Sequence, residues 1–121
     1  MIELVEQTEL GVTGSCCQPE LAPRISAAAA KALSAELGLL GHPIRLQILD
    51  LLAQHESQVC VCDLEAALPV KQPTVSHHLK LLREAGLIGC ERRGLWAYYF
   101  VQRKAVAALR VRVLAQLDAL G

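Results

Sequence analysis

The segment covering residues 61–101 constrains the fold most, because its hydrophobic spacing changes from helical to extended within a short distance. Residues 61–68 and 72–85 show helical patterns and are separated by a tight connection that contains Pro69. Two runs rich in β-forming residues follow at 87–91 and 96–101, on either side of a basic, glycine-containing turn. We therefore expect two short helices followed by a β-hairpin.

The second of these helices has a clear start, end and buried side. Pro73 is favoured in a first helical turn, and Gly86 is a natural stop after the last turn. On a helical wheel, Val75, Leu79 and Leu82 fall within about 60° of one another and form an apolar stripe. Two helices joined by a short turn and followed by a hairpin predict a winged helix-turn-helix.

Helical patterns also flank this segment. Residues 24–40 are rich in alanine and leucine and predict a helix, with Ser26 as its N-cap residue. A further helix begins at Pro43, and the last one covers residues 103–120. The predicted fold is mainly α (α+β), with about five helices and a two-stranded β-hairpin wing. The long apolar stripe of the last helix comprises Val106, Leu109, Val113, Leu117 and Leu120.

Length and composition favour a single domain. The 121 residues are 53% hydrophobic but include only four aromatic residues, which is typical of packed helices. Residues 24–121 would form the DNA-binding and dimerisation domain, and residues 1–23, interrupted by glycine and proline, a flexible N-terminal arm. No apolar run approaches the roughly 18–20 residues needed to cross a bilayer, and the acidic start does not resemble a signal peptide. We expect a cytoplasmic protein without a membrane partner.

The net charge of zero conceals a strong segregation. Residues 1–70 hold three basic and nine acidic residues, a net charge of −6, whereas residues 71–121 hold nine basic and three acidic residues, a net charge of +6. A local excess of positive charge attracts phosphate even when the total charge cancels. The basic half contains the predicted helix over 72–85 and the hairpin, so double-stranded DNA is the expected partner.

The polar face of the helix over 72–85 supports this expectation. Thr74, His77 and Lys80 point away from the apolar stripe and offer groups that bind bases and phosphates. Arginines at the hairpin tip suit the DNA backbone or a narrow minor groove. His78 lies at the edge of the stripe and is expected to pack. The predicted DNA-binding residues are Lys71, Gln72, Thr74, Ser76, His77, Lys80, Arg92 and Arg93.

Residues 72–88 (QPTVSHHLKLLREAGLI) resemble the ArsR/SmtB family of metal-responsive repressors, and residues 40–49 (LGHPIRLQIL) resemble its preceding helix. The resemblance covers roughly residues 30–120. It implies a homodimeric winged-helix repressor that leaves its operator DNA when an inducer binds. One departure is Lys71, because the family commonly has serine there. Lysine loses a good helix cap but adds a positive charge beside the phosphates.

Residues 59–64 (VCVCDL) are similar to the cysteine box of arsenic-sensing and of cadmium- and lead-sensing members. Thiolate sulfur is the appropriate donor for soft ions. Cys60 and Cys62 fall at the expected start of a helix, where partial positive charge favours thiolate. Two such positions lie about 200° apart on an ideal helix, so we expect the helix start to deform when both bind one ion.

The usual arsenic box has a third cysteine where this chain has Glu65, so As(III) would lack one of its three preferred thiolates. Cys16 and Cys17 in the N-terminal arm are the obvious supply. The expected inducer is As(III) or Sb(III), including a methylated trivalent arsenical, with Cd(II) or Pb(II) as the alternative. Which three of the four thiols bind, and whether the site lies within or between subunits, stay open.

Other classes of function fit the sequence less well. A redox or persulfide sensor on the same fold would use a thiol pair without metal. The C-terminal zinc site of the family looks absent, because residues 103–120 contain Asp118 but no histidine. Cys90 is isolated from the other cysteines and is expected to pack. A metallochaperone or thiol enzyme lacks support, since no arrangement of nucleophile, base and orienting residue is present, and we expect no enzyme activity.

Overall fold

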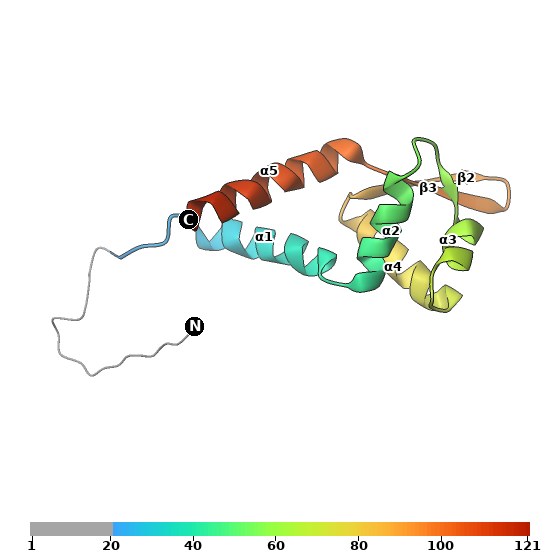
Figure 1. Ribbon diagram of the computed structural model, residues 1–121, viewed down its shortest axis with the longest axis horizontal. Coiled ribbons are helices and arrows are strands. Elements are labelled where there is room, and N and C mark those ends of the chain that lie inside the picture. Colours follow the sequence, from blue (N-terminus) through green and yellow to red (C-terminus); the bar gives the residue numbers. More distant parts are fainter. Residues whose placement is uncertain (1–20) are drawn as a thin grey trace.

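A computed structural model describes residues 21–121 (Figure 1). The chain forms five helices and three strands over this range, and the last helix returns alongside the first. The elements are α1 (Ala27–Leu40), α2 (Pro43–Ala53), β1 (Val59–Cys60), α3 (Val61–Ala67), α4 (Gln72–Glu84), β2 (Ile88–Arg93), β3 (Trp96–Val101) and α5 (Arg103–Ala119).

The ends of the helices follow the predicted local chemistry. The Ser26 side chain accepts a hydrogen bond from the backbone N–H of Ala29 at 3.1 Å and caps α1. Pro43 is the first residue of α2, where its missing N–H costs nothing. Gly86 follows α4 with φ of 80°, and Gly94 turns the hairpin with φ of 63°, a backbone conformation that glycine adopts without strain.

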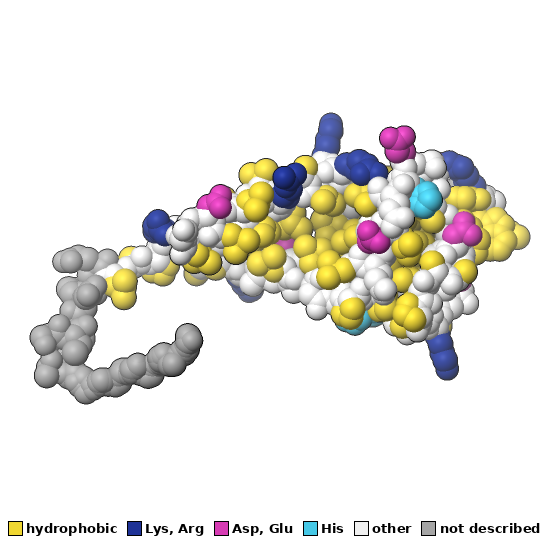
Figure 2. All heavy atoms as spheres, viewed as in Figure 1, with side chains coloured by type: hydrophobic (Ala, Val, Ile, Leu, Met, Phe, Trp, Pro, Cys, Tyr) yellow, Lys and Arg dark blue, Asp and Glu magenta, His cyan; other side chains and the backbone are white. Residues whose placement is uncertain are grey.

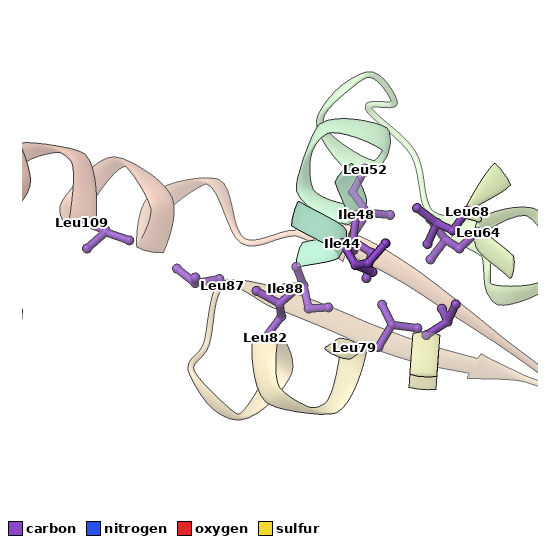
Figure 3. Packing of buried hydrophobic residues seen from close by; sticks show 11 residues of the cluster. Ile44, Ile48, Leu52, Leu64, Leu68, Leu79, Leu82, Leu87, Ile88 and Leu109 are labelled. Carbon is purple, nitrogen blue, oxygen red and sulfur yellow. The ribbon is translucent and has the colours of Figure 1, made fainter. Parts of the chain in front are cut away.

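One hydrophobic core joins α2, α3, α4 and the start of β2 (Figure 3). Helix α2 contributes Ile44, Ile48 and Leu52, which are spaced by four residues and therefore share one face. Leu79 and Leu82 of α4 pack against this face, as the predicted apolar stripe required. The core thus fixes α4 by its inner side and leaves its outer side free.

The expected two-stranded hairpin is present as β2 and β3, and a third strand that we did not expect, β1, joins it to form a three-stranded sheet. Strand β3 lies in the centre and pairs antiparallel with both β1 and β2. Strand β1 is only two residues long, with Val59 opposite Tyr99 and Cys60 opposite Tyr98. A two-residue strand has too few positions to show alternation, so its hydrophobic pattern gave no indication of it.

Helices α1 and α5 project away from the core as a pair (Figure 1). Glu36 and Arg112 join them by a 2.5 Å ion pair, and Arg24 donates a hydrogen bond to the Ala119 carbonyl at 2.6 Å. Helix α1 has no buried residue, and Leu109 is the one buried residue of α5. Figure 2 shows hydrophobic atoms exposed along this pair. The exposed leucines and valines on the two helices are Leu37, Val106, Val111, Leu114 and Leu117.

The predicted apolar stripe of α5 is therefore largely uncovered in the single chain.

Among the helices of residues 21–121, none combines the length and the hydrophobicity needed to cross a bilayer.

Candidate DNA-binding and thiol site

Helix α4 presents a polar outer face opposite its buried stripe. Val75, Leu79 and Leu82 are buried, whereas the predicted DNA-binding positions on α4 and at its start are exposed. Lys71 is the N-cap residue, and its ammonium, which has no acceptor, cannot cap the helix. The side chain is exposed and can face phosphate. The exposed positions are Lys71, Gln72, Thr74, Ser76, His77 and Lys80.

Helix α4 is attached to α2 by a polar contact at its buried edge. His78 is only 4% exposed, and its Nδ1 accepts a hydrogen bond from Nε of Arg45 at 3.0 Å. Arg45 also donates to the Leu39 carbonyl at the end of α1, at 3.0 Å. The His42 ring lies 4.3 Å from that of His78. His78 is thus a packing residue, as expected, and it also ties α4 to the end of α1.

The wing, formed by β2 and β3, carries two arginines in different environments. Arg92 is exposed and makes no side-chain hydrogen bond or ion pair within the described residues. The Arg93 guanidinium donates to the Gln58 side chain, lies 3.5 Å from Glu91 and stands 4.9 Å above the Tyr98 ring. Arg93 remains exposed, but its position is set by contacts within the protein.

Gln58 organises this group of residues. Its amide donates to Glu91 at 2.7 Å while its carbonyl oxygen accepts from Arg93. The hydrogen bond from Gln58, and then the positive charge of Arg93, lower the pKa of the Glu91 carboxyl. Gln58 could not be identified from the sequence, because it immediately precedes the two-residue strand β1 and matches no motif.

The thiols of Cys60 and Cys62 lie side by side, with their sulfur atoms 2.7 Å apart. The expected helical separation of 200° does not apply, because Cys60 is the extended N-cap residue (φ −64°, ψ 139°) and only Cys62 is inside α3. Because the chain changes from strand to helix at Val61, the side chains of Cys60 and Cys62 point toward each other. No unwinding of α3 is needed for the two sulfurs to meet.

The environment of Cys62 also differs from our expectation of a favoured thiolate. The hydrogen bond with Cys60 raises the pKa of the Cys62 thiol, and desolvation and the negative charges of Cys60 and Asp63 raise it further. A thiolate at Cys62 is disfavoured because it forms beside the sulfur of Cys60. A soft cation removes this repulsion, since it neutralises both thiolates when it displaces their protons.

The remaining predicted ligands are not brought to the pair within the described residues. Cys16 and Cys17 lie outside them. Within residues 21–121, no cluster of three or more histidine, cysteine or acidic side chains is placed to hold a metal ion. Cys90 is half-buried and pairs with Tyr99, so it points to the opposite face of the sheet from Cys60. Its position agrees with the expected packing role.

The chain resembles known regulatory proteins. A family profile described as bacterial regulatory protein, arsR family, matches residues 42–89. An HTH-type transcriptional regulator of Methanocaldococcus jannaschii is 44% identical over 61 residues, which cover 50% of this chain and 67% of that protein. The arsenical resistance operon repressor of Escherichia coli K12 is 44% identical over 61 residues, which cover 50% of this chain but only about half (51%) of the repressor.

A solved structure agrees with the fold. The homodimeric winged helix-turn-helix DNA-binding domain from Mycobacterium bovis, determined by NMR, superimposes with a TM-score of 0.57 at 34% identity. The match covers 82% of this chain and 90% of that domain. The predicted winged helix-turn-helix is therefore confirmed.

Proposed function

The chain belongs to the arsR family of bacterial regulatory proteins, and from this premise we propose that it is a cytoplasmic repressor released from operator DNA by a thiol-binding inducer. It binds the operator as a homodimer. The inducer is trivalent arsenic or antimony, inorganic or methylated. The observation that carries this proposal is the convergence of Cys60 and Cys62 at the start of α3, the helix that precedes α4.

DNA binding uses the exposed face of α4 and the wing. The second helix of a helix-turn-helix enters the major groove with its N-terminal residues near base edges. Lys71, Gln72, Thr74, Ser76 and His77 occupy that end of α4, with Lys80 one turn further. Lys80 suits the phosphate backbone, as do Arg92 and Arg93 on the wing. The excess of positive charge after residue 70 strengthens the attraction.

Dimerisation uses α1 and α5. A pair of helices with one buried residue between them has little core of its own, and its exposed apolar side chains favour burial against an identical pair. Two α4 helices related by a two-fold axis would then meet two half-sites of an inverted repeat.

The inducer binds the Cys60–Cys62 pair and takes its third sulfur from Cys16 or Cys17. Trivalent arsenic favours three thiolates, and soft ions in general favour sulfur over the oxygen of Glu65. A methylated trivalent arsenical already has one bond to carbon and needs only two thiolates. The relative from Escherichia coli is named as an arsenical resistance operon repressor, which supports arsenic over other soft ions.

Two alternatives use the same thiols. A Cd(II) or Pb(II) sensor would bind up to four sulfurs, Cys16 and Cys17 included. A redox or persulfide sensor would join a thiol pair by oxidation without metal. The close approach of Cys60 and Cys62 is compatible with either.

Fluorescence anisotropy of a labelled duplex, selected by the reduced protein from a random-sequence library, tests the proposal. The duplex is titrated with protein and then with arsenite, monomethylated trivalent arsenical, antimonite, cadmium, lead or diamide. We expect trivalent arsenic or antimony to release the duplex at the lowest concentration. Release by cadmium or lead alone would favour the first alternative, and release by diamide alone the second. Failure to select any duplex would contradict DNA binding itself.

A further inference from the structure

The thiol pair and the wing share one face of the sheet. Cys60 lies opposite Tyr98 on the central strand, and Tyr98 lies opposite Glu91 on β2. Cross-strand partners project to the same side, and side chains two positions apart do so as well. Cys60, Tyr98 and Glu91 therefore form one row, with Gln58 and Arg93 beside it on the same face.

Gln58 connects the two ends of this face. It lies two residues before Cys60, and its side chain contacts both Glu91 and Arg93. It is half-buried, whereas Glu91 and Arg93 are exposed. Gln58 is hydrogen-bonded to both members of the Glu91–Arg93 ion pair. The position of the Arg93 guanidinium on the wing therefore depends on where the backbone places Gln58, two residues before Cys60.

We infer that Gln58 is a positioning residue that couples ligand binding at Cys60 and Cys62 to the wing through Arg93. The inference rests on the proposed function, because it takes the two thiols as the inducer site. The Arg93 side chain, not Gln58, is the group that faces DNA.

The geometry of the thiols supplies the movement. An ion bound by both sulfurs replaces the contact between Cys60 and Cys62 and sets a new distance and angle between them. Cys62 is held in α3, which packs on the core through Leu64, whereas Cys60 ends a strand of two residues.

When both sulfurs bind one ion, the two-residue strand β1 therefore moves more readily than α3. A displacement of Cys60 moves Gln58 relative to β2, and the hydrogen bonds of Gln58 to Glu91 and Arg93 break or rearrange. Arg93 then loses one of the two side chains that hold it over Tyr98 and keeps only the ion pair with Glu91, so the wing presents its charge to DNA in a different position.

Trp96 provides a reporter for this coupling. It is the one tryptophan of the chain, lies on the wing opposite Arg93 and is 53% exposed. Its emission can be recorded while arsenite is added to the reduced, full-length protein without DNA. Arsenic bound per protomer is measured in the same samples by mass spectrometry after desalting.

The decisive variant is Gln58→Leu, which removes both hydrogen bonds at similar volume. Gln54→Leu is the matched control, because Gln54 makes a 3.1 Å side-chain hydrogen bond to Asp50 at the end of α2, away from the wing. In the wild type and in Gln54→Leu, we expect the Trp96 emission to change in step with arsenic binding. In Gln58→Leu, we expect arsenic to bind at the same stoichiometry while the emission change falls at least threefold.

Two results would overturn the inference and leave the proposed function standing. One is a full emission change in Gln58→Leu; the other is wild-type protein that binds arsenic with no change in Trp96 emission. Failure of the wild type to bind arsenite at all would instead contradict the proposed function and, with it, this coupling.

Discussion

Arg45 donates a hydrogen bond from its Nε to Nδ1 of His78, 3.0 Å away, and so fixes the buried edge of α4 to α2. The neighbouring residue, His77, is exposed on the face proposed to contact DNA. Because the second Arg45 contact reaches the carbonyl of Leu39 at the end of α1, one side chain links the proposed dimer helix, α2 and α4. The placement of α4 therefore depends on this contact as well as on the hydrophobic core.

Replacing His78 with leucine should destabilise the fold. The apolar side chain removes the acceptor and leaves the Arg45 Nε–H without its partner, which costs about 1–3 kcal/mol. His78→Asn keeps an acceptor near the Nδ1 position and should lose less. Urea denaturation measures both. Equal stability of His78→Leu and wild type would show that the contact contributes nothing.

Stability should also fall in mild acid because of His78. Burial first, then the charges of His42, Arg45 and His77, lower the pKa of this imidazole below its ordinary 6.5. The unfolded chain therefore takes up the proton first as the pH falls. Stability is full above about pH 6.5 and decreases as the pH falls through the folded pKa. Urea midpoints between pH 7.5 and 5 should drop more in the wild type than in His78→Asn, and parallel curves would contradict this role.

Removing one phosphate contact should weaken DNA binding and reduce its salt dependence. For Lys80→Ala or Arg92→Ala, we expect the slope of log K against log salt to decrease in magnitude by about 0.9 per lost contact. Lys31→Ala removes the same charge as Lys80→Ala from an exposed position on α1 and is the control. A Lys31→Ala slope that changes as much as that of Lys80→Ala would indicate a general charge effect and not a contact.

The α1–α5 pair should be the dimer interface. Leu117 on α5 is 56% exposed in the single chain, and a glutamate there would place a charge in the proposed apolar contact. We expect Leu117→Glu to sediment as a monomer at micromolar concentration and to lose operator affinity. Leu46→Glu, at a leucine of 53% exposure on α2, should stay dimeric. A dimeric Leu117→Glu would place the interface elsewhere.

The order of helices and the recognition helix could be predicted from the sequence because their information is local. Ser26, Pro73 and Gly86 mark ends of helices, and the repeated leucines of α4 define its buried face. The hairpin was equally clear from two β-forming runs around Gly94.

The thiol geometry and the network around Gln58 could not be predicted in this way. Both depend on β1, whose two residues are ordered by pairing with a strand about forty positions later in the chain. Without that pairing, Cys60 would be assigned to the helix and its sulfur would point away from Cys62. Contacts such as Arg45 to His78 likewise join residues 33 positions apart and have no local pattern.

The most direct test of the thiol mechanism is arsenite-induced release of the selected duplex from single cysteine variants. Cys60→Ser and Cys62→Ser each remove one sulfur from the pair, and Cys90→Ser removes a sulfur on the other face of the sheet. We expect all three variants to bind the duplex within about threefold of the wild type. Arsenite should release Cys90→Ser as it does the wild type but should fail to release Cys60→Ser and Cys62→Ser. Release of Cys62→Ser at the arsenite concentration that releases the wild type would contradict the mechanism.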